Sequence, residues 1–157
     1  MTVGRADGRT VARRFFPSLG PTVRLTALVF TACTPVTARP DFAPFPEASS
    51  ILVRAPYDRV TAFADRWLAA QGIPVHRSSP RDGYLESDWH AGVKLRCWAD
   101  AAAPGQSRVT VEAAYRPRLD PSRAPRDLEV PVPSDQEGSR LAERLLAAVG
   151  DSLGVIQ

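Results

Sequence analysis

Two cysteines, two histidines and several acidic residues are the side chains of this 157-residue sequence that could catalyse a reaction or bind a metal. A nucleophilic site would combine Cys97 with His90 or His76 and an acid such as Asp88, because a base must stand beside the thiol and be oriented by a third group. However, Cys97 alternates with three apolar neighbours in a strand-like run. The pattern therefore predicts a buried thiol with a raised pKa, not a nucleophile.

A metal site would need the two histidines to converge with carboxylates such as Asp82, Glu86 or Asp88. The sequence contains no His-x-x-x-His or Cys-x-x-Cys spacing, which would place two ligands together on one element. Glu86 and Asp88 share one face of a predicted strand, and a solvated strand face accounts for both. Phosphate-binding loops, dinucleotide-binding glycine motifs and nucleophile elbows are also missing. We therefore expect no catalytic residues, no metal and no cofactor.

Trp98 and Arg96 are the candidates for contact with a partner. Alternation along residues 93–99 places both on the side of the strand opposite Cys97. An exposed tryptophan on a sheet is typical of protein interfaces. The alternative is that the proline-rich residues 116–133 cover this tryptophan, and the sequence leaves both interpretations open.

Cys33 is the candidate for a different chemistry, the covalent attachment of lipid. A short apolar run leads into Phe30, Thr31 and Ala32, which directly precede it. This resembles the lipobox of bacterial lipoprotein signals, in which an apolar residue and two small residues precede a cysteine that receives a diacylglyceryl group. The run is far shorter than the roughly 18 apolar residues of a membrane-spanning helix. Residues 1–32 are therefore predicted to be a targeting segment, with Cys33 first in the exported protein.

How the targeting segment begins is left open. Arg13 and Arg14, followed by two phenylalanines, resemble a degraded twin-arginine signal. Alternatively, translation begins at Val23, which gives a compact signal with Arg24 as its positive residue. We prefer this second interpretation, since Arg24 otherwise interrupts the apolar residues. A third alternative is an ordinary cytosolic N-terminus with a chance cysteine.

Positive charge is concentrated in the same segment. The chain has a net charge of +3 and an isoelectric point of about 9.3. Residues 1–32 contain five arginines and one aspartate, so residues 33–157 carry a net charge of −1. Nucleic-acid-binding domains are usually basic, and we therefore expect no nucleic-acid partner. If Cys33 carries lipid, Cys97 has no partner within the chain and no disulfide is expected.

The residues from Cys33 onward predict a tether and one α+β domain. Residues 33–48 are rich in proline and are expected to be extended and poorly packed, and residues 49–157 form the domain. We expect an antiparallel, curved sheet of about four or five strands with two helices on one face, in the order β-α-β-β-β-(β)-α. Strands are predicted at residues 50–55, 84–90, 93–99 and 108–115, with an extended run at 73–77 and an optional edge strand at 128–132.

Apolar stripes predict both helices. The first, at residues 57–71, has the stripe Val60, Phe63, Ala64, Trp67 and Leu68. The second, which follows a capping box of Ser134 and Glu137, has the stripe Leu141, Leu145, Leu146, Val149 and Leu153. Asp82 and Gly83 predict a turn with positive φ. The three central strands are expected to have one covered face and one solvated face.

Three stretches resemble the BamC (NlpB) family of outer-membrane lipoproteins and its helix-grip domains. They are Ala55-Pro56-Tyr57 before the first helix, Gly72-Ile73-Pro74-Val75 after it, and residues 82–89 at the hairpin. The resemblance covers about residues 50–155. It implies a helix-grip fold and partners among the proteins of outer-membrane protein assembly.

These features predict a lipoprotein held by Cys33 in the outer membrane and facing the periplasm, where it acts as a non-catalytic binding or scaffold module. Thr34 is not the aspartate that commonly retains such proteins in the inner membrane. The alternatives for location are another membrane leaflet or the cell surface. The alternatives for function are a carrier of an apolar ligand or lipid between sheet and helices, and a small enzyme built around Cys97.

Overall fold

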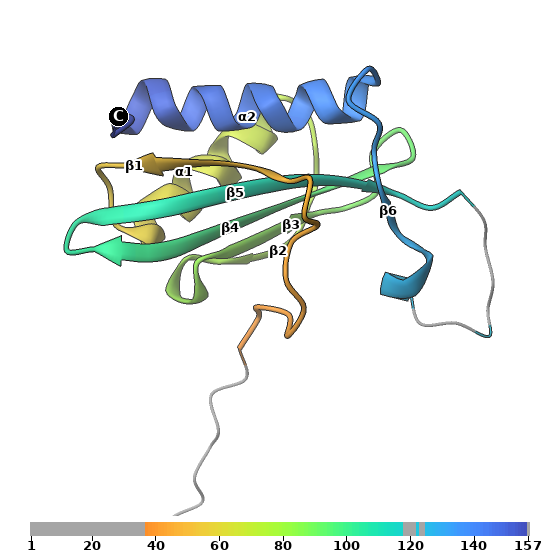
Figure 1. The fold of residues 1–157 in the computed structure, drawn as a ribbon, viewed down its shortest axis with the longest axis horizontal. Coiled ribbons are helices and arrows are strands. Elements are labelled where there is room, and N and C mark those ends of the chain that lie inside the picture. Colours follow the sequence, from red (N-terminus) through yellow and green to blue (C-terminus); the bar gives the residue numbers. More distant parts are fainter. Residues whose placement is uncertain (1–36, 118–121, 123–124, 157) are drawn as a thin grey trace, which may run out of the picture. The chain divides into compact units, whose positions relative to one another are not determined.

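The computed structural model of this chain describes residues 37–117, 122 and 125–156. Contacts divide the chain into Met1–Thr34 and Pro35–Gln157, and every described residue belongs to the second unit. The predicted signal, the lipobox Phe30-Thr31-Ala32 and Cys33 lie outside the described residues. The second unit has the predicted α+β class, with two helices packed on an antiparallel sheet (Figure 1).

Six strands and two α-helices make up the described part of the chain. In chain order they are β1 (Ser49–Val53), α1 (Tyr57–Ala70), β2 (Val75–Ser79), β3 (Tyr84–Ser87), β4 (Val93–Ala103), β5 (Gln106–Tyr115), β6 (Val130–Pro131) and α2 (Glu137–Leu153). The sheet order is β1-β5-β4-β3-β2, and β6 also pairs with β5. The sheet exceeds the expected four or five strands because β2 pairs with β3 and the optional edge strand forms as β6.

One face of the sheet and both helices enclose the apolar core. The predicted stripes are confirmed: Val60, Ala64 and Leu68 of α1 are fully buried, and α2 contributes Leu145 and Val149. From the sheet, alternate residues of β3, β4 and β5 complete the core: Leu85, Leu95, Cys97, Ala99, Val109, Val111 and Ala113. Helical and strand periodicity meet on this face, so each element buries the side that its sequence predicted.

Two glycines allow close approaches that position the sheet. Gly83 has a φ of 63° in the turn before β3, as predicted, and a Cβ there would collide with the backbone oxygen of Ala99. Gly138 lies in the first turn of α2, where a Cβ would come within 2.8 Å of the side chain of Val93. The missing side chain at residue 138 thus lets α2 pack directly on the start of β4.

The capping box predicted before α2 is wrong. Glu137 is the first residue of the helix, Gln136 is its N-cap, and no side-chain hydrogen bond caps the helix. The chain turns just before the helix through a hydrogen bond from Gln136 N to Pro133 O. This turn puts Glu137 two positions too early for a capping box, which needs the acid at the third helical position. Glu137 forms a surface ion pair with Arg144 instead.

Residues 37–48 cross the face of the sheet that the helices leave free (Figure 1, orange). We call this segment the strap. The expectation of a poorly packed tether is therefore wrong for residues 37–48. Phe42 and Phe45 are half-buried, and the backbone N–H groups of Ala38 and Phe45 donate to the carboxylates of Asp82 and Glu112. The expectation of one solvated sheet face is wrong for the same reason: β3 is buried on both sides.

Candidate functional site

A row of charged residues crosses the sheet beneath the strap. Strand register sets Glu86 of β3 opposite Arg96 of β4, and Arg96 opposite Glu112 of β5. All three alternate with core residues, so their side chains point away from the helices. Neighbours of opposite charge on adjacent strands attract one another. This row forms the centre of a charged cluster that consists of Glu86, Lys94, Arg96, Glu112, Arg116, Arg126 and Glu129.

Arg96 is the hub of the charged cluster. Its Nε donates to Glu86 at 2.7 Å, its Nη1 to Glu112 at 2.9 Å and its Nη2 to Glu129 at 2.6 Å. The Arg96 side chain is only 4% exposed. A guanidinium offers donors in a fixed planar fork, so three carboxylates around it hold it in one orientation. The result is a buried cation with matched partners.

The remaining cations bind the same carboxylates: Lys94 and Arg116 contact the oxygen that Arg96 leaves free, and Arg126 shares one oxygen of Glu112 with Arg96. Their contacts are Lys94 Nζ to Glu86 at 2.9 Å, Arg126 Nη1 to Glu112 at 2.9 Å and Arg116 Nη2 to Glu129 at 3.1 Å. Arg126 and Glu129 lie in the segment directly before β6. The charged cluster therefore ties together β3, β4, β5 and a segment more than ten residues farther along the sequence.

Hydrogen bonds fix the protonation states inside the charged cluster. Burial alone would raise the pKa of Glu86, but donors from Arg96, Lys94 and Tyr84 outweigh it and lower that pKa to about 2. Burial and the bond to Glu86 raise the pKa of the Tyr84 hydroxyl. Burial would lower the pKa of Arg96, yet its three carboxylate partners raise it. At neutral pH the carboxylate is ionised, the phenol is protonated and the guanidinium is charged.

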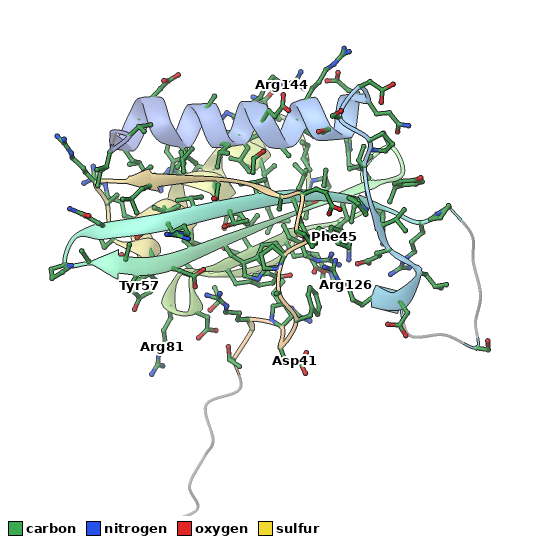
Figure 2. All side chains as sticks on the ribbon, viewed as in Figure 1. Asp41, Phe45, Tyr57, Arg81, Arg126 and Arg144 are labelled. Carbon is green, nitrogen blue, oxygen red and sulfur yellow. The ribbon has the colours of Figure 1, made fainter. Side chains whose placement is uncertain are left out.

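The strap lies on the charged cluster through aromatic and backbone contacts. Arg126 stacks on two rings, with its Cζ 4.0 Å from the centroid of Phe45 and 4.3 Å from that of Phe42. Figure 2 shows Phe45 beside Arg126. Arg126 also donates to the backbone oxygen of Ala43 at 3.2 Å, and Phe45 N donates to Glu112 at 2.8 Å. Cation–π stacking and charge-assisted hydrogen bonds thus hold the strap.

An aromatic group adjoins the charged cluster. Trp98 packs edge-on against Tyr84 and Phe42, with ring centroids 5.5 Å and 6.4 Å apart. Among the described residues, nothing accepts a hydrogen bond from the buried indole Nε1 of Trp98. The Nε of Arg116 is buried and without an acceptor in the same way. Two donors on this face are therefore buried without the hydrogen bonds that such groups usually make.

The two predicted partner contacts lie together but are not exposed. Trp98 is 1% exposed and Arg96 is 3% exposed, so neither reaches solvent in this structure. Alternation placed them correctly opposite Cys97. What alternation does not show is the cover: Phe42 of the strap lies on Trp98, and Glu129 of the segment before β6 lies on Arg96. The alternative that residues 116–133 cover Trp98 names the wrong segment, because among the described residues it is Phe42 of the strap that packs on Trp98, while Glu129 of that stretch binds Arg96.

Cys97 is buried in the core, as predicted. Burial, with a smaller effect of the Asp100 charge, raises the pKa of its thiol to about 12. A thiol with this pKa is protonated at neutral pH and does not act as a nucleophile. The residues proposed beside it lie elsewhere: His76 and Asp88 form an exposed pair at 3.3 Å, and His90 pairs through its backbone with Val93. The described residues include no group of three potential metal ligands.

The three acidic residues near the hairpin, Asp82, Glu86 and Asp88, lie in different surroundings. Asp88 is exposed, as a solvated strand face predicts, but Glu86 is buried in the charged cluster, so that expectation is wrong for Glu86. Asp82 binds the strap, accepting from Ala38 N and from Ser79. These two hydrogen bonds, of which the one from Ala38 has the larger effect, lower the pKa of Asp82. The three carboxylates therefore have separate roles and do not converge.

A groove opens at the edge of the core, between the first half of α2 and the loop before β4. It has a volume of about 270 Å³. Ile73, Val93 and Leu141 give it an apolar floor, and His90 and Arg144 stand at its rim. Large side chains occupy the space between the centre of the sheet and the helices, among them Leu68, Leu95 and Leu145. The groove therefore lies beside the core and does not extend between the sheet and the helices at their centre.

Several residues of the site were not identified from the sequence. Opposite charges at Glu86, Arg96 and Glu112 alternate with apolar residues, and pairing the predicted strands in register would have brought them together. Phe42 and Phe45 offered a weaker signal, two aromatics within a proline-rich segment. Nothing in the sequence pointed to Glu129 and Arg126. They reach the charged cluster only because the long connection after β5 folds back along that strand as β6.

The chemistry that this arrangement favours is binding. Its carboxylates are paired with cations, and its aromatic rings present faces and edges to the strap. Guanidinium groups, carboxylates and rings held in place can recognise a backbone N–H, a carbonyl and an aromatic side chain, as they do with the strap. No helix of the described residues has the length and apolar character to cross a membrane.

Comparison of the chain with models of known protein families finds no match, and comparison with curated proteins finds no similar sequence.

Proposed function

We propose that this protein is a lipoprotein anchored through Cys33 to the periplasmic side of the outer membrane, where its domain is a non-catalytic binding or scaffold module. The observation that carries the proposal is the position of Cys33. It follows Phe30, Thr31 and Ala32 directly, and the unit Pro35–Gln157 begins two residues after it. Cleavage before Cys33 would release the complete second unit with a lipid at its first residue.

Lipid chains on Cys33 supply enough free energy to hold the domain at a membrane. Each buried methylene contributes about 0.8 kcal/mol, so two or more acyl chains make a lasting anchor. The resemblance to the BamC family favours a setting in outer-membrane protein assembly, and Thr34 is compatible with that membrane. The arginines and aromatic residues of the charged cluster and its neighbours are the residue types that dominate binding energy in protein interfaces.

Metabolic labelling with an alkyne fatty acid tests the anchor. The wild-type chain should be labelled and Cys33→Ala should not. Cys97→Ala is the matched control, because it removes the only other cysteine and leaves the lipobox intact. The intact mass of the membrane-extracted wild type should correspond to a chain that begins at an acylated Cys33. Equal labelling of wild type and Cys33→Ala, or a protein that retains residues 1–32, contradicts the proposal.

A carrier of an apolar ligand is the second candidate. Large side chains fill the predicted ligand space between sheet and helices, so its site would be the groove beside α2. The groove's floor of Ile73, Val93 and Leu141 suits an acyl chain. Arg144 at its rim pairs with Glu137, so an acidic head group would have to displace that carboxylate. Mass spectrometry of lipids extracted from the purified Cys33→Ala chain tests this candidate. A carrier retains a stoichiometric lipid that Leu141→Asp loses; a Cys33→Ala chain without lipid leaves the scaffold module as the function.

A further inference from the structure

The strap is attached to the sheet as a ligand is, not as a strand. It takes no part in the strand order of the sheet. Its own backbone–backbone hydrogen bond is local, from Ala48 N to Phe45 O. Its other contacts join the two phenylalanine rings, single backbone groups and Arg39 to side chains beneath it. Such a segment can leave without breaking the ladder of the sheet.

The surface beneath the strap is fixed by contacts within the rest of the domain. Three carboxylates hold Arg96, and none of them belongs to the strap. Tyr84, opposite Trp98 on the neighbouring strand, packs edge-on against it and donates to Glu86 at 2.8 Å. If the strap left, a preformed patch of rings, guanidinium groups and a carboxylate would face solvent. Binding to a preformed surface avoids part of the ordering cost of association.

The strap is also an incomplete occupant of this surface. Trp98 is 1% exposed, and its indole Nε1 has no acceptor among the described residues. A buried donor without an acceptor costs about 1–3 kcal/mol. A different peptide could place a backbone carbonyl there and recover that free energy. A ligand with a carbonyl at this position would therefore fit this face better than the strap does.

We propose that the strap stands in for an extended segment of a partner protein, and that this segment displaces it from the charged cluster and Trp98. The strap defines the chemistry of the partner: two aromatic side chains three positions apart, as Phe42 and Phe45 are, and a free backbone N–H for Glu112. The partner adds a carbonyl for Trp98. This inference rests on the proposed function as a binding module and assigns the surface at which that module binds.

Peptide binding to the full chain with Cys33→Ala tests the proposal without any requirement for lipid. The probe is a fluorescein-labelled peptide of residues 37–48, followed by anisotropy. In the chain with an intact strap, the strap occupies the site in most molecules. The apparent affinity for the peptide is then the intrinsic affinity multiplied by the fraction of molecules whose strap is released. Adding Phe42→Ala and Phe45→Ala weakens the strap and should tighten peptide binding about tenfold or more. A peptide with both phenylalanines replaced by alanine should not bind.

A milder pair of variants controls for damage to the fold. Phe45→Leu keeps apolar bulk but removes the ring from Arg126, and should tighten peptide binding in the same direction. Phe63→Leu makes the same change on α1, where a half-buried phenylalanine packs against the core. It should leave peptide binding unchanged. Circular dichroism melts identify the variants that are folded before their affinities are compared.

Three results overturn the inference. The first is equal peptide affinity for the Cys33→Ala chain and the folded Phe45→Leu variant, and the second is equal binding of a scrambled peptide. The third is a dimer of the Cys33→Ala chain that the strap variants abolish, because a second copy would then be the occupant. None of these results bears on the lipid label at Cys33, so failure of the peptide site is distinct from failure of the anchor.

Discussion

The two faces of the sheet bury similar strands by opposite means. Against the helices, alternate residues of β3, β4 and β5 are apolar and pack into a core that includes Leu85, Leu95 and Val109. On the other face the intervening residues include the charged Glu86, Arg96 and Glu112 and the aromatic Tyr84 and Trp98, and the strap and the segment before β6 cover them. Apolar packing tolerates many partners, whereas an ion network requires each partner in its place. The comparison teaches that burial alone does not define a core.

Removing the hub of the charged cluster should have the largest effect. Arg96→Met leaves Glu86, Glu112 and Glu129 close together without their shared cation. Breaking a buried ion pair at one partner costs about 3–5 kcal/mol, so we expect the free energy of unfolding to fall by about 4 kcal/mol. Urea denaturation measures this loss. Arg96→Lys should recover little of it, because a single ammonium does not match three carboxylates in a plane; a loss below about 1 kcal/mol for Arg96→Met would show that water replaces the guanidinium.

A truncation on the apolar face should cost somewhat less. Leu145 of α2 is fully buried between the helix and the sheet. Leu145→Ala removes apolar contacts and leaves a cavity, and should lower the free energy of unfolding by about 3 kcal/mol. The same urea experiment compares it with Arg96→Met. If Leu145→Ala proves the more damaging of the two, the apolar face and not the charged cluster is the more sensitive to single changes.

Acid should weaken the charged face selectively. The folded-state pKa of Glu86 is about 2, against an ordinary value of 4.5. A carboxyl with a lowered pKa stabilises the fold above its unfolded pKa, and this contribution is lost as the pH falls through the folded pKa. Between pH 6 and pH 3 we expect Glu86 to account for about 2 kcal/mol of lost stability. The free energy of unfolding, measured at several pH values, should fall less steeply with acid in Glu86→Gln than in the wild type. Equal slopes for the two proteins would show that Glu86 is not the cause.

An exposed ion pair provides the lower limit of the comparison. Arg144 and Glu137 are 2.7 Å apart, but both side chains are more than half exposed. Solvent screens such pairs, so Arg144→Ala should change the free energy of unfolding by no more than about 0.5 kcal/mol. The same contact distance that matters greatly at Arg96 should therefore matter little here. A loss above about 1 kcal/mol would mean that exposure is a poor guide to the strength of ion pairs in this protein.

Periodicity predicted the apolar face well. The stripes on α1 and α2 and the alternation around Cys97 depend on neighbours within one element, and both are properties of local sequence. On the charged face, the sequence predicted which way the side chains point but not that they are buried. Arg96 and Trp98 do point away from Cys97, but their burial depends on the strap and on Glu129, which arrive from distant parts of the chain. Phe45 and its partner Glu112 are 67 positions apart, beyond the reach of any local pattern.

Two further errors have the same origin. Proline content predicts a segment outside helices and strands, and the strap is one, with bends and a turn at residues 46–47, yet proline content does not tell whether the segment docks. Glu86 and Asp88 were predicted to share one face of a strand, but β3 ends at Ser87, and register sets Glu86 opposite Arg96 while Asp88 lies beyond the strand. The capping box failed because a turn at Pro133 shifted the start of α2. In each case a contact outside the element determined the result.

If Cys33 carries lipid, as we propose, docking of the strap would limit how far the domain can stand from the membrane. The docked strap begins at residue 37, the first described residue, which is four residues after Cys33, and a chain of that length spans at most about 14 Å. With the strap released, sixteen residues separate Cys33 from β1, and the limit rises to about 55 Å. A partner segment that takes the strap's place would therefore also lengthen the connection between the domain and a lipid on Cys33.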